Sequence, residues 1–354
     1  MERRSMLDPR LRLAIYMEGA VTGPAGKMGF GILRYSHNPI TCVIDSQTAG
    51  RSIGTLTGID RECPIVESVR AACDIGADVF VLGIAPHGGL IPASWWSVIR
   101  EAVEAGLSIV NGLHDLVGPH FPDLKPVPST KEQFVWDIRI EPQGLGNGNG
   151  AAASLKCRRV LLIGTDMSVG KMTAGLEIAK EAERRGIPTG FVATGQIGIT
   201  ITGGGVPLDA IRVDFASGAI QREVLEHDQG GAQIVVVEGQ GSLIHPGSTA
   251  NLPLLRGSCP THLVLCHRAG QTSLLHLPHV RIPPLDRIWR LYEDLGEACG
   301  TFPRPKTVAI ALNTAHLAPM EAEAARSETE MRFGLPCADP IRDGAGRLLD
   351  AVLA

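Results

Sequence analysis

The apolar residues of the chain fall into short runs that predict buried strands, and the segments between these runs have the period of amphipathic helices. In the first part of the sequence we expect strands at residues 11–16, 40–44, 78–83 and 107–110, and helices at 65–73 and 95–105. Strands that alternate with helices are typical of βαβ units, so the pattern predicts an α/β fold with a parallel sheet.

The same alternation resumes in the second part of the chain. Strands are expected at 160–163, 189–193, 234–237, 262–266 and 307–311, and helices at 170–185, 216–228, 285–299 and 344–353. Between the two parts, residues 142–154 are rich in Gly and Asn and uncharged, which favours a linker or mobile loop. We therefore predict one α/β domain at 1–141, a linker at 142–157 and a second α/β domain at 158–354.

Length and composition agree with two globular domains. The chain has 354 residues, of which 44% are hydrophobic, enough apolar material for sizeable cores. The formal net charge is −4 and aromatic residues make up only 4%, so the chain lacks the basic field and the stacking platforms of a nucleic-acid binder. We expect a protein that acts on a small molecule and binds neither nucleic acid nor a membrane.

The cysteines favour a reducing compartment. All eight are scattered and none forms a C-x-x-C pair, so we predict reduced thiols in a cytoplasmic protein. Cys259, His262, Cys266 and His267 lie near one another, but their spacing fits no usual zinc site, and on a strand Cys266 and His267 face opposite sides. We interpret these four as buried structural residues and predict no metal site.

One segment predicts a phosphate-binding loop. It reads Gly164-Thr165-Asp166-Met167-Ser168-Val169-Gly170-Lys171-Met172-Thr173, and it follows the strand expected at 160–163 and opens a helix. Glycines let backbone N–H groups converge on an anion, and the helix N-terminus adds a favourable dipole. Lys171 supplies a mobile positive charge, and Thr173 or Asp166 is a candidate to orient a magnesium ion or a phosphate oxygen.

The loop departs from the usual G-x-x-x-x-G-K-[ST] pattern. Five residues separate Gly164 from Gly170, Met172 stands where the hydroxyl is expected, and Thr173 comes one position late. The opening Gly-Thr-Asp resembles the loop of dethiobiotin synthetases. The shifted hydroxyl weakens the case for magnesium–nucleotide chemistry, whereas phosphate binding rests on backbone amides and Lys171 and is unaffected.

A polar segment follows the strand expected at 234–237, where open α/β sheets bind their ligands. It reads Glu238-Gly239-Gln240-Gly241-Ser242-Leu243-Ile244-His245-Pro246. Glu238 is a candidate metal ligand or general base, and Ser242 and His245 add a donor and a titratable group. The plainer interpretation is a turn with an exposed acid.

Other loops at strand ends carry weaker signals. Thr194-Gly195-Gln196 follows the strand expected at 189–193 and is as readily a simple turn as a ligand contact. Arg212 is a candidate for a substrate carboxylate. In the first domain, Asp45 ends a strand as ribose-binding acids do, but residues 19–27 do not form a G-x-G-x-x-G turn, which counts against nicotinamide binding. The segments 85–92 and 111–115 also follow strands. Two interpretations fit them equally well: plain connections between elements, or residues that line a cleft.

The ordered set of these segments resembles the family of DgcN-type D-glutamate N-acetyltransferases. The resemblance extends over nearly the whole chain and rests on the following segments: Leu33-Arg34-Tyr35, Val43-Ile44-Asp45, Gly83-Ile84-Ala85-Pro86 with Gly88-Gly89, Gly112-Leu113-His114-Asp115, Gly164-Thr165-Asp166 with Gly170-Lys171-Met172-Thr173, Thr194-Gly195-Gln196, Glu238-Gly239-Gln240-Gly241-Ser242 with His245-Pro246, and Ala311-Leu312-Asn313-Thr314. It implies a Rossmann-like N-terminal domain, a P-loop C-terminal domain and acetylation of D-glutamate by acetyl-CoA.

From this implied activity we assign candidate roles to individual residues. Acetyl-CoA would be held without hydrolysis by Gly164, Thr165, Asp166, Ser168, Val169, Gly170, Lys171, Met172 and Thr173. Glu238 or His245 is the candidate base, and the amides of Gly239 to Ser242 are candidate oxyanion donors. Candidate substrate-binding residues are Gln196, Arg212, Gln240 and Arg34, because arginine binds carboxylates bidentately.

Two other classes of function fit the same motifs. The first is an ATP- and magnesium-dependent kinase or ligase of the dethiobiotin-synthetase type, which would use Lys171, Thr173 and Glu238. The second is a nucleotide-sensing protein that binds a ligand without turnover. For any of these, a symmetric homo-oligomer is the expected assembly.

Overall fold

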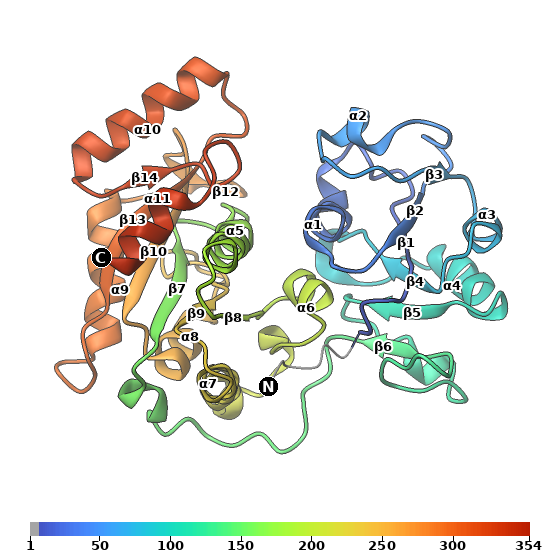
Figure 1. Cartoon of the computed structure of the whole chain (residues 1–354), viewed down its shortest axis with the longest axis horizontal. Helices are drawn as coiled ribbons and strands as arrows, with labels where there is room; N and C mark the ends of the chain where they lie inside the picture. The colour runs from blue at the N-terminus through green and yellow to red at the C-terminus, as the bar shows by residue number, and fades with distance from the viewer. Residues whose placement is uncertain (1–6) are drawn as a thin grey trace. The chain divides into compact units, whose positions relative to one another are not determined.

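In a computed structural model, which describes residues 7–354, the chain forms two compact units (Figure 1). The N-terminal unit contains residues 7–140 together with 196–210, and the C-terminal unit contains 141–195 and 211–354. Residues 196–210 therefore belong to the N-terminal unit, although they lie inside the range that the sequence pattern predicts as the second domain.

The N-terminal unit is built on a parallel sheet of six strands in the order β3-β2-β1-β4-β5-β6, as expected for a Rossmann-like domain. Its strands are β1 (Leu13–Tyr16), β2 (Ile40–Ile44), β3 (Ile65–Val66), β4 (Val79–Leu82), β5 (Ser108–Asn111) and β6 (Val135–Asp137). Its helices are η1 (Pro24–Gly26), α1 (Lys27–Tyr35), α2 (Ile53–Thr57), α3 (Val69–Asp74), η2 (His87–Gly89), α4 (Trp95–Glu104), η3 (Gly118–His120), α6 (Gln196–Thr202) and η5 (Leu208–Ala210).

The alternation of side chains along these strands decides how the helices cover the N-terminal sheet. Ala14 and Tyr16 of β1 pack with Ile99 of α4 and Val69 of α3 in one apolar cluster. Helix α1 is packed instead against α6, the helix contributed by the inserted segment 196–210. The parallel α/β fold of this unit confirms the sequence prediction.

The C-terminal unit has a second parallel sheet of six strands, in the order β14-β13-β10-β7-β9-β8. Its strands are β7 (Arg158–Gly164), β8 (Thr189–Val192), β9 (Ile234–Val237), β10 (His262–Arg268), β13 (Lys306–Asn313) and β14 (Cys337–Ala338), and β11 (Ser273–Leu274) with β12 (Leu277–Arg281) forms a separate hairpin. Its helices are η4 (Ala151–Ser154), α5 (Lys171–Arg184), α7 (Val213–Gln229), α8 (Asn251–Ser258), α9 (Leu285–Glu297), α10 (Pro319–Phe333) and α11 (Gly346–Leu353).

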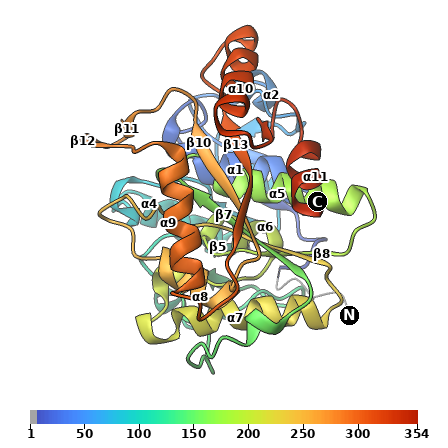
Figure 2. The same ribbon diagram turned by 90° about the vertical axis from the view of Figure 1, so that its left-hand side faces the viewer.

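Helices cover both faces of the C-terminal sheet. Val160 and Leu162 of β7 pack with Ile178 of α5 and Leu348 of α11. In Figure 2, α5 and α11 lie on one side of the strands and α9 lies on the other. From β7 the chain goes on to β8 and β9 on one side of the sheet, and from β10 it goes on to β13 and β14 on the other. The carboxyl ends of the adjacent strands β7 and β10 therefore form a topological switch point, where ligands of α/β proteins bind.

The structure differs from the sequence prediction in several local elements. Ile65–Val66 forms strand β3, and only the later part of the helix expected at 65–73 is helical, because Ser68 caps α3 by accepting the N–H of Ala71 through its hydroxyl. Helix α10 was not predicted, since it buries only Ala322 and has no apolar stripe. No helix of the described residues is long and apolar enough to cross a membrane.

The Gly/Asn-rich segment, which was expected to be a linker or mobile loop, lies against α7. The N–H groups of Asn149 and Ala151 both donate to the side-chain oxygen of Gln221, at 3.1 Å each. Gly218 of α7 has no room for a Cβ, because the carbonyl of Gly146 approaches its Cα directly. Glycines therefore serve close packing between this segment and α7, and not only flexibility.

Candidate functional site

Strand β7 leads into the predicted phosphate loop, and the loop leads into α5. Ser168 has φ 56° and Gly170, the residue before α5, has φ 107°, so two left-handed residues turn the chain between the strand and the helix. A side chain at Gly170 would be strained in this conformation. The arrangement has the strand–turn–helix form predicted from the sequence.

Glycines let the stem of Lys171 lie against the ends of two strands. A Cβ added to Gly164, at the end of β7, would lie 2.9 Å from the Lys171 ammonium nitrogen. A Cβ added to Gly239, just after β9, would lie 2.9 Å from Lys171 Cδ and would collide with the carbonyl of Leu162. Both glycines thus leave room for the lysine, and the approach of the Leu162 carbonyl also requires glycine at position 239.

Lys171 is almost entirely buried, with 6% of its surface exposed. Its ammonium donates a hydrogen bond of 2.8 Å to the main-chain carbonyl of Asp166. Burial lowers the pKa of Lys171 to about 8, while the acidic groups of Cys266, Asp166 and Glu238 act in the opposite direction. A buried ammonium of this kind gains strongly from a bound anion.

The side chains of Asp166 and Thr165 are held by the protein itself. Asp166 accepts the N–H of Met167 on one carboxylate oxygen, and on the other it accepts the side-chain amide of Gln271 at 2.7 Å and the N–H of Leu275 at 2.8 Å. Thr165 is fully buried, and its hydroxyl lies 2.9 Å from Nδ1 of His267. In this structure both residues shape the loop.

The remaining predicted loop residues differ in exposure. Met167 and Ser168 are exposed at the tip, Val169 is packed into the core of the unit, and Met172 and Thr173 are half-buried in the first turn of α5. Binding by any of these residues stays a prediction.

Glu238 follows β9 directly and is 4% exposed. One oxygen of its carboxylate accepts the N–H groups of Thr194, at 2.8 Å, and Gly195, at 3.2 Å. Burial raises the pKa of Glu238 to about 7, although these two N–H groups and Lys171 favour the charged form. The interpretation of Glu238 as an exposed acid in a turn is therefore wrong.

The segment after β8 forms the other side of the Glu238 environment. The hydroxyl of Thr194 donates to the main-chain carbonyl of Glu238 at 2.8 Å, and the side-chain amide of Gln240 donates to that hydroxyl at 3.2 Å. A Cβ on Gly195 would lie 2.5 Å from the Gln240 amide nitrogen. The ends of β8 and β9 are thus joined by hydrogen bonds around the carboxylate, and ligand binding by these two loops stays a prediction.

The other two candidate catalytic residues lie in the turn after Gln240. Ser242 is fully buried: its N–H donates to the Ser248 hydroxyl at 3.1 Å, and its hydroxyl lies 3.4 Å from the N–H of Ile244. His245 is half-buried, and its Nδ1 accepts the N–H of Gly247 at 3.1 Å. That bond leaves the ring proton on Nε2. The geometry gives Ser242 a structural role in the turn.

The turn is fixed by a buried tyrosine that the sequence reading does not select. Tyr292 of α9 is 1% exposed, accepts the N–H of Leu243 at 3.0 Å and donates to the side chain of Asn251 at 2.7 Å. Tyr292 and Gln271 belong to no motif. The partners through which they hold the two loops, Asn251 for Tyr292 and Asp166 for Gln271, are 41 and 105 residues away in sequence. No local pattern identifies such contacts.

Of the predicted substrate-binding residues, only Gln240 lies in this hydrogen-bonded group. Arg212 is exposed at the start of α7 and pairs with Glu141, at 2.8 Å between Nε and the carboxylate. Arg34 is exposed on α1, and Gln196 begins α6, so both belong to the N-terminal unit. Their roles as substrate ligands stay predictions.

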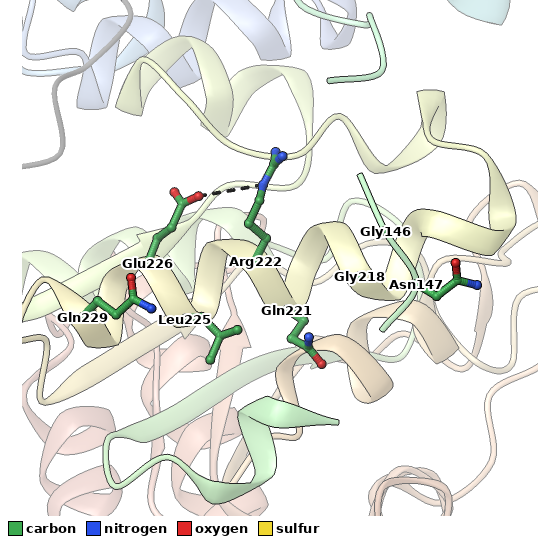
Figure 3. A pocket seen from close by; sticks show the side chains of 8 residues that line it. All are labelled: Gly146, Asn147, Gly218, Gln221, Arg222, Leu225, Glu226 and Gln229. Atoms are coloured by element: carbon green, nitrogen blue, oxygen red, sulfur yellow. Dashed lines mark ion pairs between the residues drawn. The ribbon is translucent and has the colours of Figure 1, made fainter. Parts of the chain in front are cut away.

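Two hollows lie within the C-terminal unit. A cavity of about 430 Å³ adjoins the phosphate loop's supports His267 and Gln271 and extends to Phe333 of α10. A more open one of about 380 Å³ runs along α7 beside Asn147 (Figure 3). It is lined mainly by polar side chains, and Arg222 and Glu226, one turn apart on α7, form an ion pair of 3.8 Å along the helix.

The cysteine and histidine residues around β10 are placed as the alternation predicts. Cys266, at 1% exposed, packs in the cluster under α5, whereas His267 bonds to Thr165. Burial lowers the pKa of His267 to about 4, so its ring is neutral. Among the described residues, no group of three or more His, Cys, Asp or Glu side chains has the arrangement of a metal site.

Comparison with known families agrees with this architecture. Residues 146–349 match the model of the "Domain of unknown function (DUF1611_C) P-loop domain", and residues 46–141 match the "Domain of unknown function (DUF1611_N) Rossmann-like domain". The chain belongs to the DUF1611 family. The loop between β7 and α5 lies within the range that matches this P-loop domain.

Relatives of known name span most of the chain. A D-glutamate N-acetyltransferase from Tritonibacter scottomollicae is 39% identical over 82% of this chain and 84% of its own length. Another protein of that name, from a Pseudoalteromonas species, is 35% identical over 87% of this chain and 89% of its own length. A crystal structure of a DUF1611 family protein from Anabaena variabilis is 49% identical, has a TM-score of 0.91 and covers 97% of this chain and 99% of its own.

Proposed function

We propose that this DUF1611 protein is an acetyltransferase that acetylates the amino group of D-glutamate. Two relatives that span most of the chain carry this activity in their names. The structural observation that carries the proposal is the buried Glu238 carboxylate, which is held by the N–H groups of Thr194 and Gly195 beside the phosphate-loop lysine.

The phosphate loop suits acetyl-CoA as the acetyl donor. Coenzyme A carries a pyrophosphate and a ribose phosphate, which a loop with left-handed residues Ser168 and Gly170 ahead of a helix N-terminus can bind. The buried ammonium of Lys171 supplies the positive charge that a phosphate needs. Bound in this way, acetyl-CoA supplies the activated acetyl group, and no phosphate bond has to be broken.

Glu238 fits the role of general base. The ammonium of D-glutamate must lose a proton before its nitrogen attacks the thioester carbonyl. A carboxylate with a pKa near 7 accepts that proton efficiently at neutral pH, because catalytic bases work best when their pKa lies near the operating pH. His245 is the alternative base, and its half-buried position in the turn leaves part of its ring accessible to solvent.

The activity can be tested with purified protein. Acetyl-CoA is incubated with D-glutamate or L-glutamate, and release of free thiol is followed together with mass detection of N-acetylglutamate. We expect thiol release that depends on D-glutamate. A thermal melting curve checks that the protein is folded. If folded protein gives no D-glutamate-dependent thiol release, the substrate assignment is rejected.

An ATP-dependent kinase or ligase is the second candidate, since the loop's opening resembles that of dethiobiotin synthetase. The oxygens of Asp166 that would approach a magnesium ion accept hydrogen bonds from Met167, Gln271 and Leu275, which counts against it. Titrations of acetyl-CoA and of magnesium-ATP on the same sample separate the two functions. Tight binding of magnesium-ATP with no affinity for acetyl-CoA favours the second.

We further propose that the enzyme works in the cytoplasm as a homo-oligomer. The eight cysteines are all free thiols, several of them deeply buried, which suits a reducing compartment. Closed symmetric assemblies are the commonest state of soluble enzymes. Light scattering coupled to gel filtration measures the assembly directly, and a monomeric mass would reject it.

A further inference from the structure

Two motifs of the N-terminal unit meet at the carboxyl ends of its strands. Gly88 and Gly89, in the turn after β4, have φ 81° and 69°, and the carbonyl of Gly89 accepts the N–H of His114 at 2.8 Å. A Cβ on Gly89 would lie 2.5 Å from the His114 ring. Glycine is therefore needed at position 89 both for the turn and for the ring that lies against it.

The His114 ring is one neighbour of a guanidinium that the sequence motifs do not include. Arg139 follows β6, and its Nε donates to the carbonyl of Gly112 at 2.8 Å. Its Nη1 lies 2.9 Å from Nε2 of His114 and also donates to the carboxylate of Asp209. A backbone carbonyl, an imidazole and a carboxylate thus fix the plane of this guanidinium.

The Arg139 cation is buried more deeply than its counter-ion. Its side chain is 9% exposed, whereas that of Asp209 is 48% exposed. Burial lowers the pKa of Arg139, and Asp209 opposes this effect. Desolvating a cation is costly unless an anion lies close to it, so a guanidinium in this environment favours any carboxylate that reaches it.

The carboxylate partner comes from the inserted segment. Gln196, at the start of α6, packs its side chain against Gly112, and Asp209 lies in η5 of the same segment. Residues 196–210 therefore bring an exposed, exchangeable carboxylate to a guanidinium fixed by β6 and by the turn after β5. A ligand carboxylate has the same charge and the same acceptor oxygens as Asp209, and arginine can bind it bidentately.

We propose that Arg139, with His114, is a carboxylate-binding site of the N-terminal unit, and that a carboxylate of the amino-acid substrate replaces Asp209 there. The inference rests on the proposed function for the identity of the ligand, a dicarboxylic amino acid. It assigns substrate recognition to Arg139 and to the turn at residues 112–115, whose Gly112 carbonyl accepts a hydrogen bond from Arg139.

The test compares substrates that each lack one carboxylate. D-Glutamine has an amide in place of the side-chain carboxylate, and D-isoglutamine has one in place of the main-chain carboxylate. The wild-type protein should prefer D-glutamate over both in kcat/KM. Arg139→Gln should raise KM for D-glutamate about tenfold or more, leave KM for acetyl-CoA unchanged and abolish one of the two preferences. A loss of stability alone changes neither preference.

The control is Arg12→Gln, which removes another arginine–aspartate pair of the same unit, Arg12 with Asp78, on the exposed surface. Its kinetics should match the wild type. If Arg139→Gln does not fold, Asp209→Asn replaces it: this variant keeps Arg139 and removes the competing carboxylate, so KM for D-glutamate should fall. An unchanged or higher KM overturns the inference.

Failure of the proposed function gives a different result. If the wild type acetylates D-glutamate and Arg139→Gln keeps both preferences, the carboxylate site is rejected and the function stands. If the wild type acetylates nothing, calorimetric titration with glutarate decides the inference alone. Binding that Arg139→Gln abolishes supports the site, whereas equal binding, or no binding to the wild type, rejects it.

Discussion

Glu238 and Lys171 occupy one buried electrostatic environment at the carboxyl ends of β9 and β7. Their exposed fractions are 4% and 6%, and each charge favours the ionised form of the other. Burial acts more strongly than this attraction, so the pKa of Glu238 rises to about 7 and the pKa of Lys171 falls to about 8. Both groups therefore titrate near neutral pH, which makes them accessible to a pH-rate experiment.

The pH dependence of kcat/KM for acetyl-CoA should be bell-shaped. Glu238 acts as a carboxylate, so the rate should rise as the pH increases through about 7. Lys171 binds phosphate as an ammonium, so the rate should fall as the pH increases through about 8. Glu238→Gln should lose roughly 10²- to 10⁴-fold in kcat and lose the rising limb. A variant that keeps the rising limb would transfer the role of base to another group, with His245→Gln as the next variant to measure.

Lys171→Ala should weaken acetyl-CoA binding by roughly tenfold or more, because a hydrogen bond to a charged group contributes about 1.5–3 kcal/mol. Calorimetric titration measures this directly. The matched control is Lys180→Ala, which removes an exposed lysine of the same helix. Equal affinities for the two variants would show that the loop does not hold the coenzyme. In addition, the rising limb should move to higher pH in Lys171→Ala, since the ammonium lowers the pKa of Glu238.

Gly239→Ala should destabilise the protein. Its Cβ would collide with the carbonyl of Leu162 and lie 2.9 Å from Lys171 Cδ, and neither the strand nor the buried lysine can move away freely. We expect a loss of about 1–3 kcal/mol or more in the free energy of unfolding, measured in urea. Gly146→Ala is the control, because a Cβ there has nothing within 4 Å. Similar unfolding midpoints for the two variants would contradict the packing described here.

Acetyl transfer should not depend on a divalent metal. The carboxylate of Asp166 is engaged by Met167, Gln271 and Leu275, and opening it to a metal would break these hydrogen bonds. Rates measured with excess EDTA and with added magnesium should agree. A rate that EDTA abolishes and magnesium restores would instead favour the nucleotide-dependent chemistry considered as the alternative.

The strands of both units were largely predictable, because buried parallel strands are continuous apolar runs. The strand expected at 234–237 is β9 with the same bounds, and the lysine after the glycine turn does begin a helix. Helix α10 was not predictable from periodicity, since Ala322 is the one residue that it buries and no apolar stripe marks the helix in the sequence.

Only those residues of the candidate site that belong to local sequence motifs could be predicted. The acid after β9 and the lysine that begins α5 could be identified because strand ends and helix starts are local features. The same reasoning selected Arg34 and Arg212 as substrate ligands and did not select Arg139, whose partner Asp209 is 70 residues away. It also treated Asp166 as ligand-facing, whereas its acceptors are used by distant residues. Such pairings depend on tertiary structure.

Because of the inserted segment 196–210, the chain passes between the two units more than once. The chain passes between them at 140–141, leaves the C-terminal unit after Gly195 and returns to it at Ile211. A recombinant fragment cut at residue 141 would lose α6 and leave bare the surface of α1 that it covers. Gene fission at that boundary would therefore give two incomplete proteins, and the amides of Thr194 and Gly195 that hold Glu238 lie immediately before one of these crossings.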